Sequence, residues 1–567
     1  MNDQTHGNVG FDGATVGTSH FVFQRNDKLL IQAHIGFAYF ALLIGALAGV
    51  LQTLQRTGVI TLPSALGYYQ LLTLHGVSLA LVFTTFFIIG FLYSGMAKTT
   101  GGRLCSGERG WGWTGYGLML GGTLLALYPI ITNDASVLYT FYAPLKASPL
   151  FYIGLAALVV GSWSSSIAIF SAFRRWRKAH PGESSPLFAY MSVATMILWD
   201  ICSLGVAIEV VVQLIPWSLG WVERVDVTLS RTLFWYFGHA LVYFWLLPAY
   251  IYWYVNVPRL IRGRIFSNSL PRLTFILFIL YSIPVGLHHQ LNEPGVSSIW
   301  KFVQVVLTFF VVIPSFLTAF SLLATFELAG RSQGGKGLLG WLTKLPYKDV
   351  RFLAPFLGMV MFVPAGIGGI INASYQINQV VHNTLWVTGH FHLTLATSVI
   401  LTFFGISYML IPILSGRTLT RKANNLGIVQ AFTWAIGMLF MSGGMHIVGL
   451  LGEPRRISYT TYGDAPITQD WEIYRQFMAL GGGILFTGIV LFLIIVLYLW
   501  FYAPKAEQPV EYPIGEVIDD QKKPPYFLER WSLWIGVAVG LILLAYTVPF
   551  IQMFIHPASG ALPMRTW

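Results

Sequence analysis

About thirteen stretches of the chain are apolar and long enough to cross a lipid bilayer as helices, and no other feature restricts the fold so strongly. A helix needs roughly 20 apolar residues to span the hydrocarbon core. The stretches run over 30–55, 68–94, 112–132, 150–173, 187–214, 228–257, 272–290, 301–328, 352–373, 383–412, 425–451, 476–502 and 531–556. Because backbone polar groups cannot stay unpaired in lipid, the sequence predicts an all-α, polytopic membrane protein.

The composition and the short connections both favour a single membrane domain. Only 10% of the residues are charged, whereas soluble domains average about 25%. No connection between the apolar stretches is long enough for a separate soluble domain. We expect a cytoplasmic N-terminal tail (1–27), a core of about twelve helices (28–502), a cytoplasmic linker (503–530) and an additional C-terminal helix with an outer tail (531–567).

The distribution of Lys and Arg predicts how the chain is oriented. Basic residues gather in the connections that follow even-numbered stretches and are rarer in the others. By the positive-inside rule, these connections and the N-terminus face the cytoplasm. The net charge of +11 therefore follows from topology and does not indicate a nucleic-acid partner. Arg455 and Arg456 depart from the rule, because they fall on the predicted outer side, and need a separate explanation.

Seven of the thirteen histidines form a group that packing alone does not explain. They are His75, His239, His288, His289, His382, His390 and His392. Ionisable groups inside a membrane are costly and usually functional, and imidazole is a common ligand for haem iron and copper. The sequence therefore predicts metals held by histidine. His34 and His446 have no clustered partner, and we interpret them as hydrogen-bonded interior residues.

The spacing of His390 and His392 predicts two planar cofactors beside one helix. Residues two apart on an α-helix point about 200° apart, so one metal cannot use both side chains. His75 can supply the second axial nitrogen to one haem, which would make it a six-coordinate, low-spin, electron-transfer haem. The other haem would keep an open face, over which three further histidines can hold a copper ion. These are His239, His288 and His289.

Four motifs give the chain a close resemblance to a known family. They are LTLHG, GHALVYFWLLPAY, HHQ and VVHNTLWVTGHFHL, and their order matches across most of the chain. The chain resembles the catalytic subunit I of the haem-copper oxidase superfamily, and within it the B family, of the cytochrome c oxidase type. Leu241 stands where A-family members commonly carry a glutamate, and the connection after the second stretch lacks the A-family D-channel pattern.

The resemblance implies a role for each residue of the predicted site. Tyr243 lies one helical turn after His239 on the same face, and in the family this tyrosine is joined covalently to that histidine and gives an electron and a proton when dioxygen is cleaved. The implied ligands are His75 and His392 for the low-spin haem, His390 for the high-spin haem, and His239, His288 and His289 for copper. The implied propionate layer holds Arg455, Arg456, Arg231, His382 and Asn383. The implied proton path holds Tyr250, Tyr254, Thr308, Ser315, Thr318 and Ser321.

Three positions depart from the pattern that the resemblance leads us to expect. Ala240 and Thr388 stand where proline is usual, and Asn378 stands where an acid often assists a propionate. None of the three removes a ligand. Asn378 weakens any assignment of an acid there as the group that takes up the pumped proton.

The implied activity is the reduction of dioxygen to water coupled to proton translocation in a prokaryotic inner membrane. The implied cofactors are two haems, a low-spin one of b type and a high-spin one of a type, and one copper ion. The implied partners are a subunit II with a dinuclear copper centre, a small membrane subunit, membrane lipids, and cytochrome c or quinol as electron donor.

Three alternatives stay open at this point. A quinol oxidase would have the same core, and only its donor would differ. A nitric oxide reductase of the same fold generally lacks the cross-linked tyrosine and often adds acids at the second metal, so Tyr243 and Leu241 argue against it. A transporter with a histidine path for protons or metal ions would show no haem absorption bands.

Overall fold

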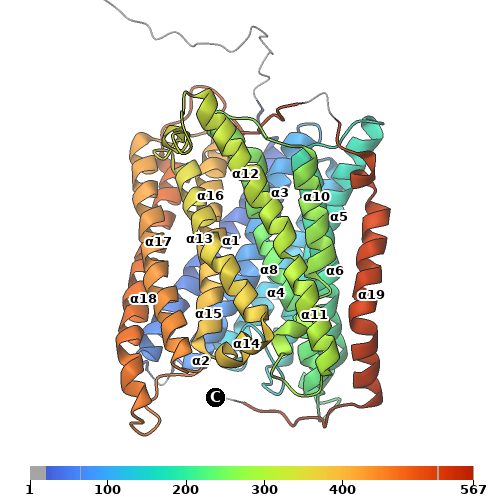
Figure 1. Cartoon of the computed structure of the whole chain (residues 1–567), viewed down its shortest axis with the longest axis vertical. Helices are drawn as coiled ribbons and strands as arrows, with labels where there is room; N and C mark the ends of the chain where they lie inside the picture. The colour runs from blue at the N-terminus through green and yellow to red at the C-terminus, as the bar shows by residue number, and fades with distance from the viewer. Residues whose placement is uncertain (1–20, 64, 520–522, 566–567) are drawn as a thin grey trace, which may run out of the picture.

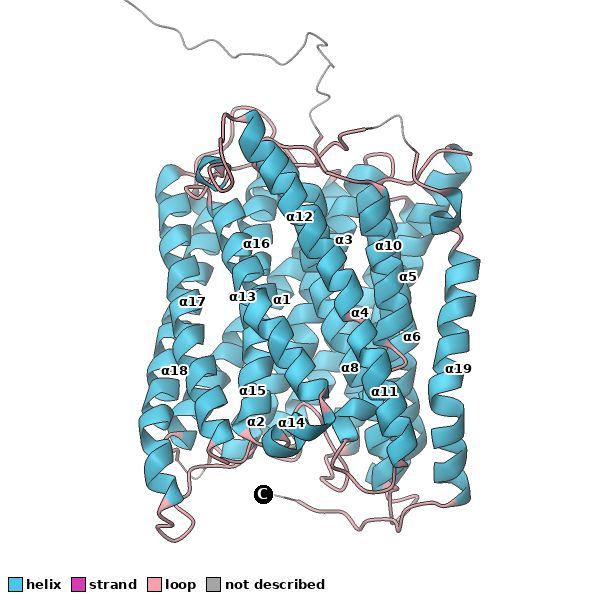
Figure 2. Cartoon of the chain, viewed as in Figure 1, coloured by secondary structure: helices cyan, strands magenta, loops and turns pink. Residues whose placement is uncertain are grey.

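The computed structural model describes residues 21–63, 65–519 and 523–565, and it is a bundle of long helices that run roughly parallel to one another (Figures 1 and 2). Twelve helical segments within these ranges are long and apolar enough to cross a membrane. A shorter apolar helix, α10 (Ser269–Ser282), lies in the seventh predicted stretch. Together they account for the thirteen predicted stretches.

The helices follow the predicted order. The first six stretches are α1 (Arg25–Arg56), α2 with α3 (Tyr68–Gly76, Thr84–Thr99), α4 (Ser106–Ile131), α5 (Pro149–Ala179), α6 with α7 (Leu187–Ile208, Ile215–Ser218) and α8 with α9 (Val227–Ile251, Val257–Leu260). The last six are α11 with α12 (Ser298–Phe310, Val312–Ser332), α13 (Val350–Ala373), α15 with α16 (Leu385–Phe391, Ile400–Ser415), α17 (Arg421–Leu450), α18 (Ile467–Leu497) and α19 (Trp531–Ile555), and the short α14 (Tyr375–Val381) connects α13 to α15.

The seventh stretch is not one continuous helix. We expected it to run over 272–290, but α10 ends at Ser282 and a separate 3₁₀ turn spans Gly286–Gln290. Pro284 lies between the two. Proline has no N–H to continue the helical hydrogen bonds, and its ring crowds the preceding turn, so it ends the helix and allows the 3₁₀ turn to take its own direction.

Five of the spans contain π-helical segments, which the sequence does not predict. They are Val77–Phe83, Glu209–Leu214, Tyr252–Asn256, His392–Val399 and Tyr498–Tyr502. The first begins two residues after His75, and the fourth begins at His392 itself. Segments of this kind are rare and frequent at functional sites. The regular-helix angle between His390 and His392 is therefore only approximate.

The three spans that carry most of the predicted ligands are also the most deeply buried. In the apolar windows of Tyr68–Thr99, Val227–Leu260 and Leu385–Ser415, 89%, 89% and 94% of the residues are inside the protein. The corresponding share is only 22% for α19. The histidines of these three spans therefore lie toward the centre of the bundle, and α19 lies at its edge (Figure 1).

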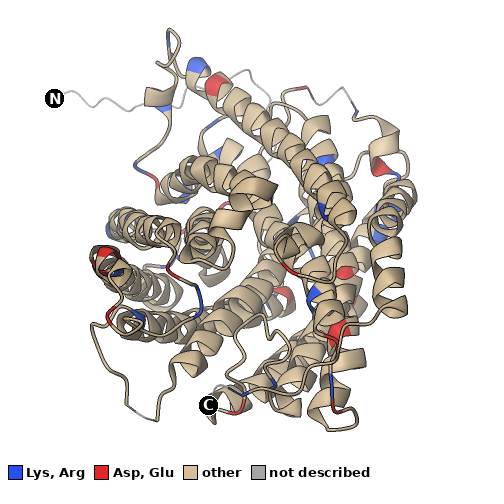
Figure 3. Ribbon diagram, turned by 60° about the horizontal axis from the view of Figure 1, so that its bottom comes forward, with Lys and Arg blue, Asp and Glu red and all other residues tan. Residues whose placement is uncertain are grey.

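Two of the basic connections, which follow the fourth and sixth spans, meet the segment 503–530 at one end of the bundle. Arg177 and Arg272 both pair with Glu529, at 2.9 and 2.6 Å, and Arg259 pairs with Glu511 at 2.8 Å. Figure 1 shows the segment after α19 at the opposite end, and Figure 3 shows few charged residues along the lengths of the helices. Which end faces the cytoplasm stays a prediction, and residues 1–20 of the predicted tail lie outside the described ranges.

Candidate metal and cofactor site

A cavity of about 700 Å³ lies within the bundle, and six of the seven grouped histidines line it. They are His75, His239, His288, His289, His390 and His392. The rest of the lining is mostly apolar, with Tyr243, Arg455 and Arg456 among the polar exceptions. Concave, largely apolar sites with a few placed polar groups are typical of cofactor binding. The cavity is also large enough for bulky planar groups.

His239, His288 and His289 form a cluster whose potential ligand atoms all lie within 4.8 Å of one another. α8 supplies His239, and the 3₁₀ turn supplies the other two. Nδ1 of His239 is 3.1 Å from Nε2 of His289, while Nε2 of His239 is buried without a hydrogen-bond partner in the described chain. Three converging imidazole nitrogens are the donor set that suits copper.

Hydrogen bonds and stacking orient the two histidines of the turn. Nδ1 of His288 donates to the Val285 carbonyl and lies 3.0 Å from the hydroxyl of Thr308, which leaves Nε2 of His288 for a ligand. The ring of His289 stacks on Trp235 with 3.8 Å between centroids. The bond made by one imidazole nitrogen determines which nitrogen can ligate a metal.

His75 and His392 have the geometry expected of two axial ligands. Their ring planes are within 10° of parallel, and their centroids are 6.4 Å apart. Nδ1 of His75 donates to the Gly45 carbonyl at 2.9 Å, and Nδ1 of His392 donates to the Thr388 carbonyl at 2.8 Å. Both rings therefore keep Nε2 for a metal, so these residues fit a haem.

Glycines on neighbouring helices give the haem-side imidazoles their space. A Cβ added at Gly49 of α1 would lie 2.5 Å from Nδ1 of His75, and a Cβ at Gly368 of α13 would lie 2.6 Å from Nδ1 of His390. Real Cβ atoms do not come that close. His390 lines the same cavity as His75 and His392. Nε2 of His390 could therefore bind a second planar group.

The two histidines interpreted as interior residues do not line the cavity. Nδ1 of His34 donates to the Leu30 carbonyl at 2.9 Å. Nδ1 of His446 donates to the Ser442 carbonyl at 2.7 Å, although His446 lies close to the cavity wall beside Trp386. Both contacts agree with that interpretation.

Tyr243 and most of the predicted proton path form a series of neighbouring groups. The ring of Tyr243 is 5.2 Å from that of His239, and Tyr243 and Ser315 both line the cavity. The Tyr250 hydroxyl interacts with Ser315 and Thr318. The Tyr254 hydroxyl lies near Thr318 and Ser321, the last predicted member of the path, but the hydroxyls of Tyr254 and Ser321 make no hydrogen bond within the described residues. Thr308 is the exception, because it contacts His288.

The predicted propionate layer is assembled at one end of the cavity. Arg455 donates from its backbone N–H to the Asn383 carbonyl at 2.9 Å and from Nη2 to Asn383 Oδ1 at 2.8 Å. Arg231 and Arg456 both lie over the ring of Tyr142, at 5.0 and 4.8 Å. Arg231 also pairs with Glu293 at 2.9 Å.

This layer has more positive than negative charge. Burial, followed by the charge of Arg455, lowers the pKa of His382 to about 4. Burial and the adjacent Arg456 lower the pKa of Arg455 to about 10. Nε of Arg455 and Nε2 of His382 are buried without partners in the described chain. A carboxylate placed here would accept from Nε of Arg455 and offset the repulsion, so the residues fit haem propionates.

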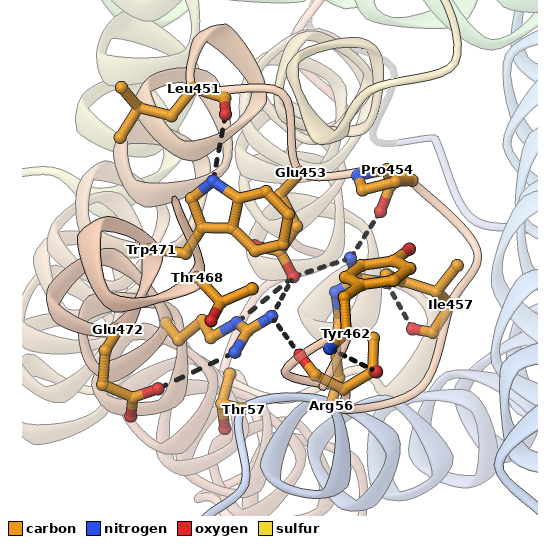
Figure 4. A network of polar contacts seen from close by, with 12 residues as sticks. Arg56, Thr57, Leu451, Glu453, Pro454, Ile457, Tyr462, Thr468, Trp471 and Glu472 are labelled. Carbon is orange, nitrogen blue, oxygen red and sulfur yellow. Dashed lines mark hydrogen bonds and ion pairs between the residues drawn. The ribbon is translucent and has the colours of Figure 1, made fainter. Parts of the chain in front are cut away.

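A buried ion cluster behind this layer was missed by the sequence reasoning. Glu453 accepts from Arg56 of α1 at 3.1 Å and from Arg475 of α18 at 3.3 Å, and the three side chains are only 1–6% exposed. Arg56 also donates to the carbonyls of Pro454 and Ile457, at 2.7 and 2.6 Å (Figure 4). The guanidinium therefore holds the backbone on both sides of the pair 455–456. Charged residues at span ends were the available signal, but nothing local indicates that they pair.

These observations define a class: a polytopic membrane protein whose buried cavity brings together histidines suited to planar metal cofactors and a three-histidine metal site. Residues 30–484 match the family described as "Cytochrome C and Quinol oxidase polypeptide I". The chain belongs to this family, the subunit I of haem-copper terminal oxidases.

Individual relatives agree with this membership. The chain is 40% identical to cytochrome c oxidase subunit 1 of Thermus thermophilus, over 93% of this chain and 95% of the relative. It is 20% identical to quinol oxidase subunit 1 of Bacillus subtilis, over 81% and 70%. A solved heme-copper terminal oxidase dimer superposes with a TM-score of 0.90 at 35% identity, covering 96% of each chain.

The predicted fold, family and enzyme class are confirmed by these comparisons. The chain is the catalytic subunit of a haem-copper terminal oxidase, an oxidoreductase of respiratory electron transport that sits in a membrane with several passes. The family uses haems and copper, and a subunit 1 belongs to an assembly with other subunits.

Proposed function

We propose that the cavity holds two haems and one copper ion and reduces dioxygen to water. His75 and His392 would hold the low-spin haem, of b type, and His390 the high-spin haem, of a type. His239, His288 and His289 would hold copper. Haem iron and copper, when bound, supply the oxygen-binding and electron-transfer chemistry. One observation carries the proposal: the cluster of His239, His288 and His289 lines the same cavity as His75, His390 and His392.

We assign Tyr243 the role of electron and proton donor to dioxygen. Its ring lies 5.2 Å from the ring of His239 and lines the same cavity. Loss of the phenolic hydrogen gives one electron and one proton to the substrate, and a later electron and proton restore the phenol. The covalent bond to His239 that the resemblance implies would fix the phenol in place before the reaction begins.

The proton for this step would reach Tyr243 from the end of the bundle that carries the basic connections. Ser321, Tyr254, Thr318, Tyr250 and Ser315 would relay it, because their hydroxyls follow one another at close range along α12 and the span Val227–Leu260. Thr308 would act at the other side, through His288. We infer that this end of the bundle faces the cytoplasm of a prokaryotic cell, and that the membrane is the inner membrane.

The arginine layer would hold the haem propionates on the opposite side. Arg455 and Arg456 line the cavity, and an arginine forms strong charge-assisted hydrogen bonds with a carboxylate. Arg231, His382 and Asn383 would complete the layer. Asn378, which accepts from His382 at 3.0 Å, cannot itself carry a proton as a carboxyl group could. The group that takes up the pumped proton would therefore have to lie elsewhere in this layer.

We propose cytochrome c as the donor, by way of a subunit II with a dinuclear copper centre. The chain has only two cysteines and no motif for such a centre of its own. The identity is 40% to a cytochrome c oxidase subunit and 20% to a quinol oxidase subunit, which favours cytochrome c. A small membrane subunit would complete the assembly.

Purification of the complex tests these assignments directly. We expect reduced-minus-oxidised spectra with two distinct haems, haem extraction that gives one b and one a macrocycle, and oxygen consumption with reduced cytochrome c. Oxygen consumption with quinol and not with cytochrome c would instead identify quinol as the electron donor. A colourless protein would overturn the cofactor assignments, and oxygen-insensitive reduction of nitric oxide would favour the reductase alternative.

A further inference from the structure

The C-terminal helix α19 lies at the edge of the bundle, yet five of its residues are buried, and two adjacent ones lie against the turn that carries His288 and His289. Ala545 and Tyr546 are 0% and 2% exposed, on a helix that is otherwise largely exposed (Figure 1). They form a small apolar cluster with Leu287, which is also 0% exposed and precedes His288 in the 3₁₀ turn. Ala538 packs separately, against the main core. At Ala545 and Tyr546, the helix packs directly against the turn with the two histidines.

The contacts at this point are hydrogen bonds to the backbone of the turn. The Tyr546 hydroxyl accepts from the Gly286 N–H at 2.8 Å. Gln304 of α11 accepts from the Leu287 N–H at 2.7 Å through Oε1 and donates to the Ala545 carbonyl at 3.1 Å through Nε2. Two consecutive amides directly before His288 and His289 are thus bound by α19 and by a glutamine that α19 itself holds.

The first amides of a helical turn have no partner within the turn. In the interior of a membrane protein, water is not at hand to replace that partner, so each unpaired amide is costly. The contacts from Tyr546 and Gln304 therefore stabilise the turn in this one position. The packing is close enough that a Cβ at Gly286 would lie 2.5 Å from the Trp235 carbonyl oxygen and 2.6 Å from the Tyr546 hydroxyl.

We propose that Tyr546 and Gln304 are positioning residues for copper, so that the additional C-terminal helix is functionally part of the copper site. This rests on the proposed assignment of His239, His288 and His289 as the copper ligands. The two residues touch no ligand nitrogen. They fix the backbone from which His288 and His289 project toward His239, and supporting contacts of this kind typically contribute about 10–100-fold to metal affinity.

The alternative is that α19 only packs against the bundle. In that case the loss of the Tyr546 hydroxyl would lower thermal stability and leave copper affinity unchanged. Tyr236 provides a matched control on α8. Its ring contacts that of Tyr546 at 5.1 Å, but its hydroxyl bonds the Ile201 carbonyl at 3.3 Å, away from the turn. Both tyrosines can be changed to phenylalanine, which removes one oxygen atom from each.

The test measures copper affinity in the purified, assembled complex. Wild type, Tyr546→Phe and Tyr236→Phe are equilibrated with a graded series of a copper chelator, and copper per haem iron is determined by elemental analysis. Copper in a partner subunit is common to all samples and cancels in the comparison. We expect Tyr546→Phe to release the site copper at about 10–100-fold lower chelator activity than wild type. Haem spectra should stay unchanged, and Tyr236→Phe should match wild type.

Three results are distinguishable. A wild-type complex with no copper beyond that of its partner subunit would overturn the proposed copper site itself. A normal wild type with Tyr546→Phe indistinguishable from Tyr236→Phe would overturn only the role of α19. If Tyr546→Phe cannot be purified, Gln304→Met decides on the same readout, because it removes the bonds to both Leu287 and Ala545. Wild-type copper affinity in that variant would equally overturn the inference.

Discussion

The ligand atoms of His239, His288 and His289 lie within 4.8 Å of one another, whereas His75, His390 and His392 are distributed around a cavity of about 700 Å³. The proposed copper cluster comes from one helix and one short turn, and neutral hydrogen bonds hold that turn. The haem side comes from two spans whose helices change to π-helix beside the ligands, and buried charges hold its arginine loop. An ion needs only converging nitrogens, whereas a haem also needs space and counter-charge.

The largest expected effect breaks the haem side alone. His392→Ala or His75→Ala should abolish the low-spin haem signal, because each removes one of two axial bonds. Copper should stay, since its ligands are already assembled without these residues. The measurement is the reduced-minus-oxidised spectrum together with elemental analysis. His446→Ala is the control, because His446 lies nearby but not on the cavity, and a normal bis-histidine spectrum in His392→Ala would contradict the assignment.

The reciprocal change breaks the copper side alone. His288→Ala or His289→Ala should lose the copper ion from this site while both haems are largely kept, because two nitrogens hold the ion much more weakly than three. Copper per haem iron is the readout. His180→Ala is a suitable control, since His180 stacks on Trp176 far from the cavity. Unchanged copper in both active-site variants would require a different set of ligands.

The two regions also differ in how well the sequence predicts them. Helix count, order and the ligands' spans follow from apolar length and from histidines in apolar surroundings, which are local properties. The break in the seventh stretch was open to prediction from Pro284, whose consequence for the helix is also local. The existence of the turn Gly286–Gln290 can therefore be predicted from the sequence, but its hydrogen bond to Tyr546, 260 positions from Gly286, cannot.

The haem side depends more on long-range pairing. Arg56 and Glu453 are 397 positions apart, and no local pattern indicates that they meet. The π-helices beside His75 and His392 also have no sequence signature in the apolar pattern. Thr308 shares the polar spacing of the proton path, but its helix ends at Phe310 before α12 begins, and it faces His288 instead. These features depend on how distant helices pack.

A third variant keeps both regions intact and removes only the chemistry between them. Tyr243→Phe should bind both haems and copper and accept electrons, yet consume oxygen about 100-fold more slowly or worse, since the phenolic electron and proton are lost. Steady-state oxygen consumption with full cofactor analysis measures this. Tyr252→Phe serves as the control, because the Tyr252 hydroxyl bonds the Arg351 carbonyl at 2.9 Å outside the cavity. Near-normal turnover in Tyr243→Phe would make this residue a packing residue only.

The smallest expected effect concerns the charges that hold the haem-side loop. Glu453→Gln leaves Arg56 buried without a counter-charge and leaves Arg475 only the partly exposed Glu472, at 3.8 Å. Breaking a buried ion cluster in this way costs about 3–5 kcal/mol. Glu327→Gln is the matched control, because Glu327 pairs with Arg331 on the surface, where both side chains are over 40% exposed. Such an exposed pair contributes about 0–1 kcal/mol.

Glu453→Gln should therefore lower the unfolding temperature of the purified complex clearly more than Glu327→Gln does. The same variant should also affect the two regions differently. Because Arg56 binds the carbonyls of Pro454 and Ile457 around the arginine pair, Glu453→Gln should loosen haem retention in the spectrum while copper per molecule stays as in wild type. If Glu453→Gln lost copper as readily as haem, or unfolded at the same temperature as Glu327→Gln, the buried charges would not be specific supports of the haem side.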